Sequence, residues 1–427
     1  MAYKRYWRDR DNCMDYGIVF VVLACLVGLW MTWGIGANDL ANIMSTAMGS
    51  KAISVKQALL IAIVFEIAGA FLGGNEVSDT IRGGIIDVSE FSSNILIYSM
   101  LSVLFAGATW ITMASFLGMP VSITNAIVGA IVGVGAMMLG LEAIHWKTVG
   151  YIAISWICAP FVAGVVAFLL FISIRRFILA AENPFQSAKY FVPIYLILVG
   201  FILSMMTTLK GLNHFHVNFN FLQKCMLVFA TTVFVILLGL LAMRQLRLRT
   251  KLHRHTQYIY IEGMFSVLMG FTACAMVFAH GSNDVGIAVG PIAGIISLVG
   301  TGGAMADGRL LSSIMLFGCL GVVLGLFMYG RKVIATVGSS ITTLTPSRAF
   351  AATLAAATVV VASTSTGIPV SATQTLVGAV FGVGLARGID ALNLGVMRNI
   401  FMSWIITIPA AAILATVFFY ILQMIFG

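Results

Sequence analysis

Long apolar runs recur along the whole chain and are separated by short polar segments. The first run, from Tyr16 to Trp33, contains no charged residue. About 20 apolar residues suffice to cross the hydrocarbon core of a bilayer as a helix, whereas β-barrel strands would show alternating segments of about 10 residues. The apolar runs predict helical membrane segments near residues 17–36, 52–74, 94–117, 121–141, 147–173, 189–209, 223–243, 259–280, 286–300, 310–330, 348–366, 368–386 and 399–426.

The composition agrees with this pattern. Of the 427 residues, 60% are hydrophobic and 9% are charged, and the mean hydropathy is +1.04. Soluble globular chains carry roughly 25% charged residues, so this chain cannot cover itself with a polar surface. We therefore predict an all-α polytopic protein of the cell (inner or plasma) membrane, surrounded by lipid, with about 12 membrane segments.

The net charge is +9, which in a soluble protein would suggest a nucleic-acid partner. In a membrane protein, basic residues instead gather in the loops that set its orientation, so we expect no nucleic acid. The stretch Arg244–Gln257 holds five Lys or Arg residues and no acidic residue. We expect it to lie in the cytoplasm as a topological anchor; the alternative is a calmodulin- or lipid-binding segment.

The two halves of the chain resemble each other. The stretches GMPVSITNAIVGAIVGVG (Gly118–Gly135) and GIPVSATQTLVGAVFGVG (Gly367–Gly384) are identical at eleven of eighteen positions, at an offset of 249. Two further pairs have offsets of 245 to 249: GANDLAN with GSNDVGI, and SWICAP with SWIITIP. The chain is therefore a tandem duplication. We divide it into an N-terminal segment (1–16), a first repeat (17–174), connecting or scaffold helices (175–243), a basic cytoplasmic linker (244–258) and a second repeat (259–427).

The relative orientation of the repeats depends on residues 121–141. If this segment crosses the membrane fully, seven spans separate the two Asn-Asp motifs and the copies are antiparallel; if it is re-entrant, the count makes them parallel. Full crossing places the N-terminus outside, although several basic residues precede the first span. Because three aspartates dilute that charge and the central basic loop is the stronger signal, we predict two inverted-topology repeats with broken or re-entrant helices.

The duplicated Asn-Asp motif is a candidate cation site. Asp39 and Asp284 each lie between two apolar runs, with no Lys or Arg nearby in sequence. An aspartate at the centre of a membrane helix costs about 2.5–3.5 kcal/mol, so such residues are commonly functional. Together with Asn38 and Asn283, and with carbonyls released by the surrounding glycines, they form an oxygen-rich set suited to Na⁺. The alternatives are proton binding and, for either motif alone, an ordinary loop outside the membrane.

The duplicated Pro-Val-Ser motif is a candidate anion site. Gly-x-Pro interrupts a helix, and the following serine stands at the N-cap position of a new one. Helix N-termini attract anions through free N–H groups and about half a unit of positive charge. We therefore predict that Ser122, Thr124, Ser371 and Thr373 line a site for a small oxyanion, although membrane helices also use such residues for capping and packing alone.

One further acid lies inside an apolar run. Glu66 has a glycine as its aligned counterpart, so any role in gating or coupling is asymmetric between the repeats. A channel is disfavoured because paired broken helices with buried acids indicate a closed binding site. An enzyme is disfavoured as well, because neither an activated nucleophile nor a metal-ligand set is visible.

These motifs resemble those of the inorganic phosphate transporter (PiT) family of cation-coupled phosphate symporters. GANDLAN and HGSNDVGIAVGP are similar to the family signatures GANDVAN and HGANDVANAIGP, and the two Pro-Val-Ser elements to its repeated G-x-PVSTTH. The resemblance runs from Trp33 to Pro409. It implies two inverted repeats with a scaffold, phosphate held together with Na⁺ (or H⁺ in some members), a homodimer, and a family glutamate that Glu66 matches. It also adds Asn42 to the expected phosphate-binding residues.

The chain departs from the family pattern at several positions. The threonine after the motif serine is Ile123 in one copy and Ala372 in the other, and the motif histidine is Asn125 and Gln374. The second asparagine of the Asn-Asp motif, Asn42 in the first copy, is isoleucine in the second. An anion site with fewer donors can still bind phosphate through backbone N–H groups, or can prefer sulfate or another oxyanion.

Together, these features predict a secondary active symporter that imports inorganic phosphate with Na⁺ by alternating access. The expected ligands are phosphate and Na⁺, with Na⁺ held at Asp39 and Asp284, and no cofactor is expected. The alternatives are an oxyanion permease of the same fold and H⁺-coupled phosphate transport. Because the second Asn-Asp copy lacks one asparagine, we expect tighter cation binding at the first copy.

Overall fold

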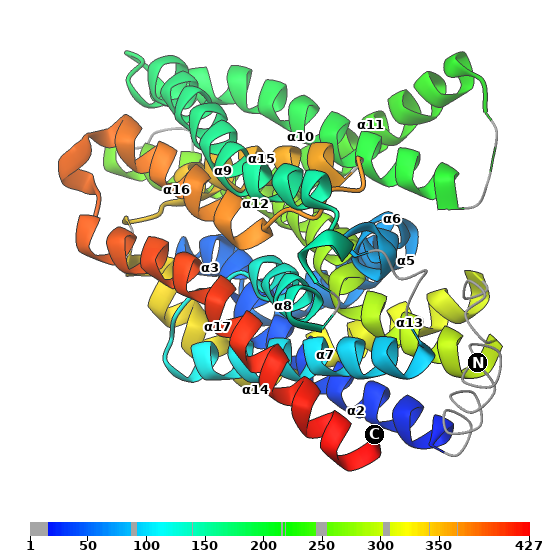
Figure 1. Cartoon of the computed structure of the whole chain (residues 1–427). Coiled ribbons are helices and arrows are strands. Elements are labelled where there is room, and N and C mark those ends of the chain that lie inside the picture. Colours follow the sequence, from blue (N-terminus) through cyan, green and yellow to red (C-terminus); the bar gives the residue numbers. More distant parts are fainter. Residues whose placement is uncertain are drawn as a thin grey trace.

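The computed structural model describes residues 16–86, 92–138, 140–214, 217, 219–244, 254–301, 308–340, 342–364 and 366–427. Across these residues the chain is helical, apart from turns and one isolated bridge between Ile86 and Ile144. Ten of the described helices are long and apolar enough to cross a membrane. The chain is thus a multi-pass, all-helical membrane protein, as predicted (Figure 1).

The helices of the first half are α2 (Gly17–Ile35), η1 (Gly36–Leu40), α3 (Ala41–Gly49), α4 (Val55–Ile61), η2 (Ala62–Glu66), α5 (Ile67–Gly73), α6 (Asn75–Asp79), η3 (Thr80–Gly84), α7 (Ser93–Phe116), α8 (Ile123–Met138), η4 (Leu141–Ala143), α9 (Trp146–Ile174), η5 (Arg175–Leu179), α10 (Pro184–His214) and α11 (Phe221–Arg244). Here η denotes a π- or 3-10-helical turn. Residues 1–15 of the predicted N-terminal segment and 245–253 of the predicted linker lie outside the described part of the chain.

The helices of the second half are α12 (Arg254–His280), η6 (Gly281–Val285), α13 (Gly286–Thr301), α14 (Gly308–Ser340), α15 (Pro346–Thr364), α16 (Ala372–Arg387), η7 (Ile389–Ala391) and α17 (Leu394–Phe426). Two segments predicted as separate, 259–280 and 286–300, form one continuous helix with a π turn at its centre. The glycines and the proline near this π turn were expected to weaken the helix. They do not unwind it, since Pro291 lies inside α13.

Two helical hairpins, α7–α8 and α15–α16, enter the bundle from opposite faces. Near the start of α7, the Tyr98 hydroxyl donates to the Phe426 carbonyl at the end of α17, 3.1 Å away. At the other end of α17, the preceding turn joins it to α16, the second helix of hairpin α15–α16. Since α17 has 33 residues and rises 1.5 Å per residue, the openings of the two hairpins are separated by roughly the thickness of the membrane.

The repeats are therefore inverted, as predicted, but residues 121–141 do not cross the membrane. Helix α7 ends beside Asn38, which lies midway along the first long helix, and α8 returns towards the face from which α7 came. The hairpin contributes no net crossing. The number of membrane crossings counted from the sequence linked a re-entrant segment 121–141 to parallel repeats. That count was wrong, because it treated α7 as a complete span.

Each hairpin packs on the other repeat through closely spaced glycines. A Cβ at Gly378 or Gly382 of α16 would overlap a backbone oxygen of α9. A Cβ at Gly129 of α8 would likewise lie 2.7 Å from the Ile408 carbonyl oxygen of α17. Small residues four apart let membrane helices approach closely. The two repeats are thereby interlocked, with α9 beside α16 and α8 beside α17 (Figure 1).

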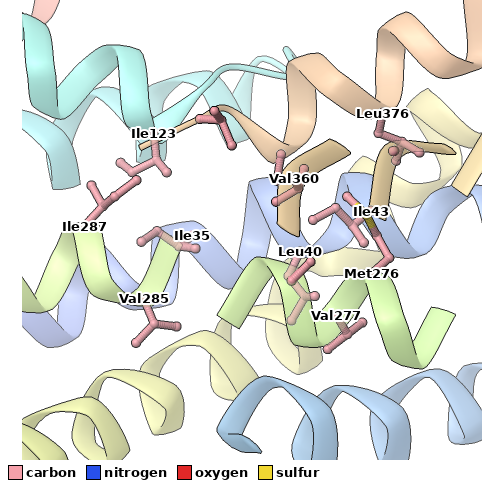
Figure 2. Packing of buried hydrophobic residues seen from close by; sticks show 14 of the residues in the cluster. Ile35, Leu40, Ile43, Ile123, Met276, Val277, Val285, Ile287, Val360 and Leu376 are labelled. Atoms are coloured by element: carbon pink, nitrogen blue, oxygen red, sulfur yellow. The ribbon is translucent and has the colours of Figure 1, made fainter. Parts of the chain in front are cut away.

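Apolar residues from both repeats surround the region where the hairpins end. Figure 2 shows Ile35 of α2, Ile123 of α8 and Ile287 of α13 in one buried cluster. Helices α10 and α11 follow the first repeat, and α11 packs mainly on α10 while exposing residues such as Phe229 and Phe234. The polar groups described next therefore lie in an apolar interior.

Candidate functional site

The two Asn-Asp motifs lie on π-helical turns at equivalent places in the repeats. Turn η1 carries Asn38 and Asp39, and turn η6 carries Asn283 and Asp284; all four side chains are buried. A π turn widens the helix locally and is frequent at functional sites. The sequence predicted unwound backbone here, whereas the structure retains a continuous, locally widened helix.

Each motif asparagine binds the Pro-Val-Ser turn of its own repeat. The Asn38 side chain donates to the Met119 carbonyl at 3.0 Å and accepts from the Val121 backbone N–H at 3.3 Å. The Asn283 side chain donates to the Val370 carbonyl at 2.5 Å and accepts from the Val370 N–H at 3.4 Å. Asn38 and Asn283 thus satisfy buried backbone groups where the helices are interrupted.

The Pro-Val-Ser serines begin the two hairpin helices, as predicted. The Ser371 hydroxyl accepts from the Gln374 backbone N–H at 3.1 Å, and the Ser122 hydroxyl accepts from the Asn125 N–H at 3.2 Å. Ser122 also donates to the Asn125 side-chain oxygen at 3.0 Å. The residues that replace the family histidine therefore occupy the third helical position, where a polar side chain commonly accompanies an N-cap serine.

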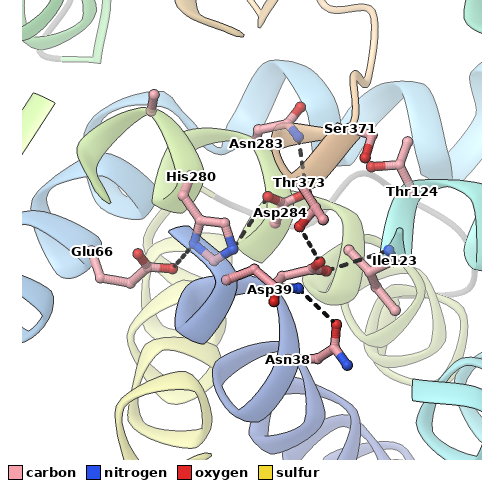
Figure 3. Close-up of polar contacts among 12 residues, drawn as sticks. Asn38, Asp39, Glu66, Ile123, Thr124, His280, Asn283, Asp284, Ser371 and Thr373 are labelled. Atoms are coloured by element: carbon pink, nitrogen blue, oxygen red, sulfur yellow. Dashed lines mark hydrogen bonds and ion pairs between the residues drawn. The ribbon is translucent and has the colours of Figure 1, made fainter. Parts of the chain in front are cut away.

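Asp39 joins the two hairpins. Its carboxylate accepts from the Thr373 hydroxyl at 2.5 Å and from the Ile123 backbone N–H at 3.3 Å, so both hairpin helices contact one acid through their first turns (Figure 3). The Thr124 hydroxyl donates to the Val370 carbonyl at 3.1 Å, which links the two Pro-Val-Ser turns directly. The structure thus brings the predicted cation and anion residues of the two repeats into contact.

Asp284 has different neighbours. It accepts a hydrogen bond from Asn283 at 2.9 Å, and its other oxygen lies 3.2 Å from Nε2 of His280. The Nδ1 atom of His280 lies 2.7 Å from Oε1 of Glu66, and both of these residues are fully buried (Figure 3). Glu66, His280 and Asp284 therefore form a chain of polar contacts leading away from the anion-type residues.

Sequence reasoning missed His280. The residue ends a long apolar run and lies four positions before Asp284, a spacing that places two helical side chains on one face. That spacing was the available signal. No pattern within one segment could have indicated Glu66 as the other partner, because Glu66 lies 214 residues earlier in the chain.

Asn42 lies one turn beyond Asn38. It donates to the Asn38 side-chain oxygen at 3.2 Å, while its own buried side-chain oxygen has no hydrogen-bond partner among the described residues. Buried polar atoms are nearly always hydrogen-bonded, so such an atom indicates a place for water or an ion. The equivalent residue of the second repeat, Ile287, is buried and apolar.

The arrangement combines two kinds of ligand chemistry within one buried region. Carboxylate and amide oxygens suit a hard cation such as Na⁺, while hydroxyls and the first-turn N–H groups of two helices suit an anion. The Asp39 carboxylate uses some of those same anion-type donors. A cation near Asp39 would therefore favour an anion at the neighbouring hairpin termini.

Comparison with known proteins agrees with this geometry. The sequence matches the phosphate transporter family over residues 35–415. The chain belongs to the phosphate transporter family. It is accordingly a multi-pass membrane transporter and not an enzyme.

Relatives of this phosphate transporter family member cover nearly its whole length. It is 43% identical over 419 residues to a protein of Haemophilus influenzae named "Putative phosphate permease", covering 97% of this chain and 99% of that one. It is 37% identical over 417 residues to the chloroplastic inorganic phosphate transporter 2-1 of Arabidopsis thaliana, covering 93% and 71%. A solved structure of "The sodium-dependent phosphate transporter" aligns with a TM-score of 0.87 at 35% identity, covering 95% of this chain and 100% of that one.

Proposed function

We propose that this chain is a secondary active symporter that imports inorganic phosphate with Na⁺. The observation that carries the proposal is the position of Asp39, whose carboxylate contacts Thr373 of one hairpin and the Ile123 N–H of the other. A cation bound there would neutralise the acid and release two donors towards the substrate. Na⁺ and phosphate would then each favour binding of the other, as coupled transport requires.

The roles of individual residues follow from this geometry. Asp39 and Asp284 hold Na⁺, aided by the side chains of Asn38 and Asn283. Phosphate is bound by the side chains and adjoining amides at the hairpin termini, namely Ser122, Thr124, Ser371 and Thr373, with Asn42 at their edge. Glu66 acts through His280 on Asp284 and does not contact phosphate.

Alternating access is the motion that we infer from the inverted hairpins. Because the two hairpins open to opposite faces, moving one exposes the site to one side and moving the other exposes it to the other side. In this proposal the two repeats move relative to a scaffold. The repeats are residues 17–174 and 259–427, and the scaffold includes residues 175–243. The homodimer implied by the family resemblance stays a prediction.

The test is uptake of radiolabelled phosphate by purified protein in liposomes, with Na⁺ and proton gradients imposed separately. An inward Na⁺ gradient should drive accumulation, and a proton gradient alone should not. Uptake driven by protons without Na⁺ would establish H⁺-coupled transport instead. Protein-free liposomes and liposomes loaded with equal Na⁺ on both sides are the controls.

One observation favours a second substrate. Ile123 and Ala372 replace two hydroxyls of the family motif, so the site relies more on backbone N–H groups, which do not distinguish between tetrahedral oxyanions. Unlabelled sulfate added in excess tests this alternative. If sulfate competes as well as phosphate does, the chain is a general oxyanion permease; we expect phosphate to compete much better.

A further inference from the structure

A line of buried polar residues runs along α3 in the first repeat only. Asn42, Ser45 and Thr46 are all at least 98% buried. At the offset of 245 that relates the Asn-Asp motifs, the equivalent residues of α13 are isoleucine, glycine and proline. Ser45 and Thr46 donate to backbone carbonyls of their own helix, whereas the Asn42 side-chain oxygen has no partner among the described residues. The polar line is therefore a feature of one half of the molecule that the duplication does not explain.

This polar line borders a small cavity beside Thr373, the residue whose hydroxyl binds Asp39. The cavity has a volume of about 10 Å³, close to the minimum that holds one water molecule. Its wall includes Thr373, which binds Asp39, and Thr342, which lies in the segment between α14 and α15. The remaining lining residues are the three polar residues of α3 and the side chains of Leu344, Leu376, Val377 and Val380. The cavity is thus a narrow space for about one water molecule, lined by Thr373, Thr342 and the polar residues of α3; we call it the α3 passage.

Two arginines bind the segment at the Thr342 end of this passage. Arg387, at the end of α16, donates to the Thr342 hydroxyl at 2.7 Å and to the Thr343 carbonyl at 3.3 Å. Arg348, on α15, donates to the same Thr343 carbonyl at 2.9 Å. Two guanidinium groups therefore converge on the short segment 342–345. The residue equivalent to Arg387 in the first repeat is Met138, so the other hairpin has no guanidinium group at this position.

The contacts of α15 place this end of the passage at the face where α12 starts, which the basic linker predicts to be cytoplasmic. The Glu262 carboxylate, near the start of α12, accepts from the Ser347 N–H and hydroxyl, both at 2.8 Å. The segment 342–345 therefore lies at the same face as the start of α12, to which the basic linker connects. Arg175 reaches this face as well, where it donates to the Ala386 carbonyl at 3.0 Å. Basic residues gather on the cytoplasmic side of membrane proteins.

We propose that Arg387 and Arg348 form a cytoplasmic gate and a transient oxyanion site at the end of the α3 passage. In the closed state they hold segment 342–345 over the passage. When that segment moves, the passage connects the Asp39–Thr373 region to the cytoplasm, and the freed guanidinium groups bind the departing tetrahedral oxyanion in their fork geometry. The proposal rests on the proposed function, since it assumes that the buried site releases an anion.

The features that form this gate are not repeated at the equivalent positions of the other half. Because α13 is apolar where α3 is polar, and Met138 stands where Arg387 does, the equivalent described positions repeat neither the polar wall nor the Arg387 guanidinium group. In this proposal Arg387 and Arg348 receive the anion on the cytoplasmic side. Such an arrangement lowers the barrier between the buried site and the cytoplasm in both directions, and the Na⁺ and phosphate gradients set the direction of net transport.

Accessibility of the passage is the direct test. The experiment uses a full-length variant whose native cysteines are replaced and whose transport is verified. Thr46→Cys is added to it, and the rate at which this cysteine reacts with a membrane-impermeant thiol reagent measures how accessible the passage is. Labelling in inside-out vesicles, which present the cytoplasmic face, should rise several-fold when Arg387→Met or Thr342→Val is added. Arg176→Met, which removes an exposed arginine of turn η5 at the same face, is the matched control and should leave the rate unchanged.

A second measurement separates the gate from the function on which it rests. Arg387→Met should lower the rate of net phosphate uptake, whereas Thr342→Val, which keeps both guanidinium groups, should leave equilibrium binding of phosphate, measured in detergent with Na⁺ present, within about twofold of the parent protein. If neither Arg387→Met nor Thr342→Val changes the labelling rate of the Thr46→Cys protein, and uptake stays normal, the gate is overturned and the symporter stays intact. Faster labelling in a protein that binds sulfate and not phosphate would support the gate and overturn the choice of substrate.

Discussion

Asp39 and Asp284 occupy equivalent positions in the two repeats, but their neighbours differ. Asp39 contacts donors of both hairpins, whereas Asp284 lies beside Asn283 and His280. A cation at Asp39 therefore replaces the hydrogen bonds from Thr373 and Ile123, and these donors can then bind an anion. A cation at Asp284 instead competes with the His280 imidazole for the carboxylate. We expect Asp39 to be the acid that couples the two ligands more strongly.

The first prediction concerns this acid. Asp39→Asn should abolish Na⁺-dependent phosphate uptake, because the neutral amide attracts a cation less and still occupies the Thr373 hydroxyl. Uptake into liposomes measures the effect, with thermal stability in detergent as the control for folding. Coupled transport at the parental rate by this variant would contradict the assignment of the cation site.

The second prediction concerns the buried contact between Glu66 and His280. Glu66→Ala removes the partner of Nδ1 of His280, which lies 2.7 Å away in an apolar interior, and should lower stability by about 1–3 kcal/mol. A lower melting temperature in detergent is the readout. Glu66→Gln, which keeps a side-chain oxygen within reach, is the matched control and should recover much of the stability. Equal melting temperatures for the two variants would show that the hydrogen bond contributes little.

At the scale of the element, the hairpin helices show which features sequence can predict. The N-cap positions of Ser122 and Ser371 were predicted because Gly-x-Pro followed by serine is a local signal, readable within a few residues. The end of α7 was not, because its 24 residues are apolar enough to pass for a complete span. A long apolar run shows that a segment is hydrophobic enough to enter the membrane. How deep the segment lies there depends on its contacts with other helices, here those with Asn38.

The third prediction tests how the hairpins are packed. Gly382→Ala would place a Cβ well inside van der Waals contact with the Gly164 carbonyl oxygen, so α9 and α16 must move apart, at a cost of about 1–3 kcal/mol. Gly150→Ala on α9 is the control, because no atom lies within 4 Å of the added Cβ there. Melting temperatures in detergent should fall for the first variant only. A Gly382→Ala protein as stable as the parent would mean that this interface adapts without cost.

At the scale of the whole molecule, the duplication predicted the fold more completely than the site. Equal spacing between motifs indicated two copies of one unit, and inverted copies place equivalent residues at opposite faces. The contacts between the two copies could not be predicted from the sequence. They arise because α8 packs on α17, and α16 packs on α9, across the repeat boundary. The Thr373–Asp39 bond is a consequence of that exchange, since its partners are 334 residues apart.

The fourth prediction tests the inversion itself. Glu142 and Asp390 are exposed residues of the equivalent turns η4 and η7. A single cysteine at Asp390 should react with an impermeant thiol reagent only from the cytoplasmic side, and one at Glu142 only from the outside, in a background without native cysteines. Both variants replace an exposed acid near a helix start, so each serves as the control for the other. Because equivalent residues of parallel repeats would lie on one face, labelling of both cysteines from the same side would exclude inversion, and with it the alternating exposure by opposed hairpins on which the transport proposal depends.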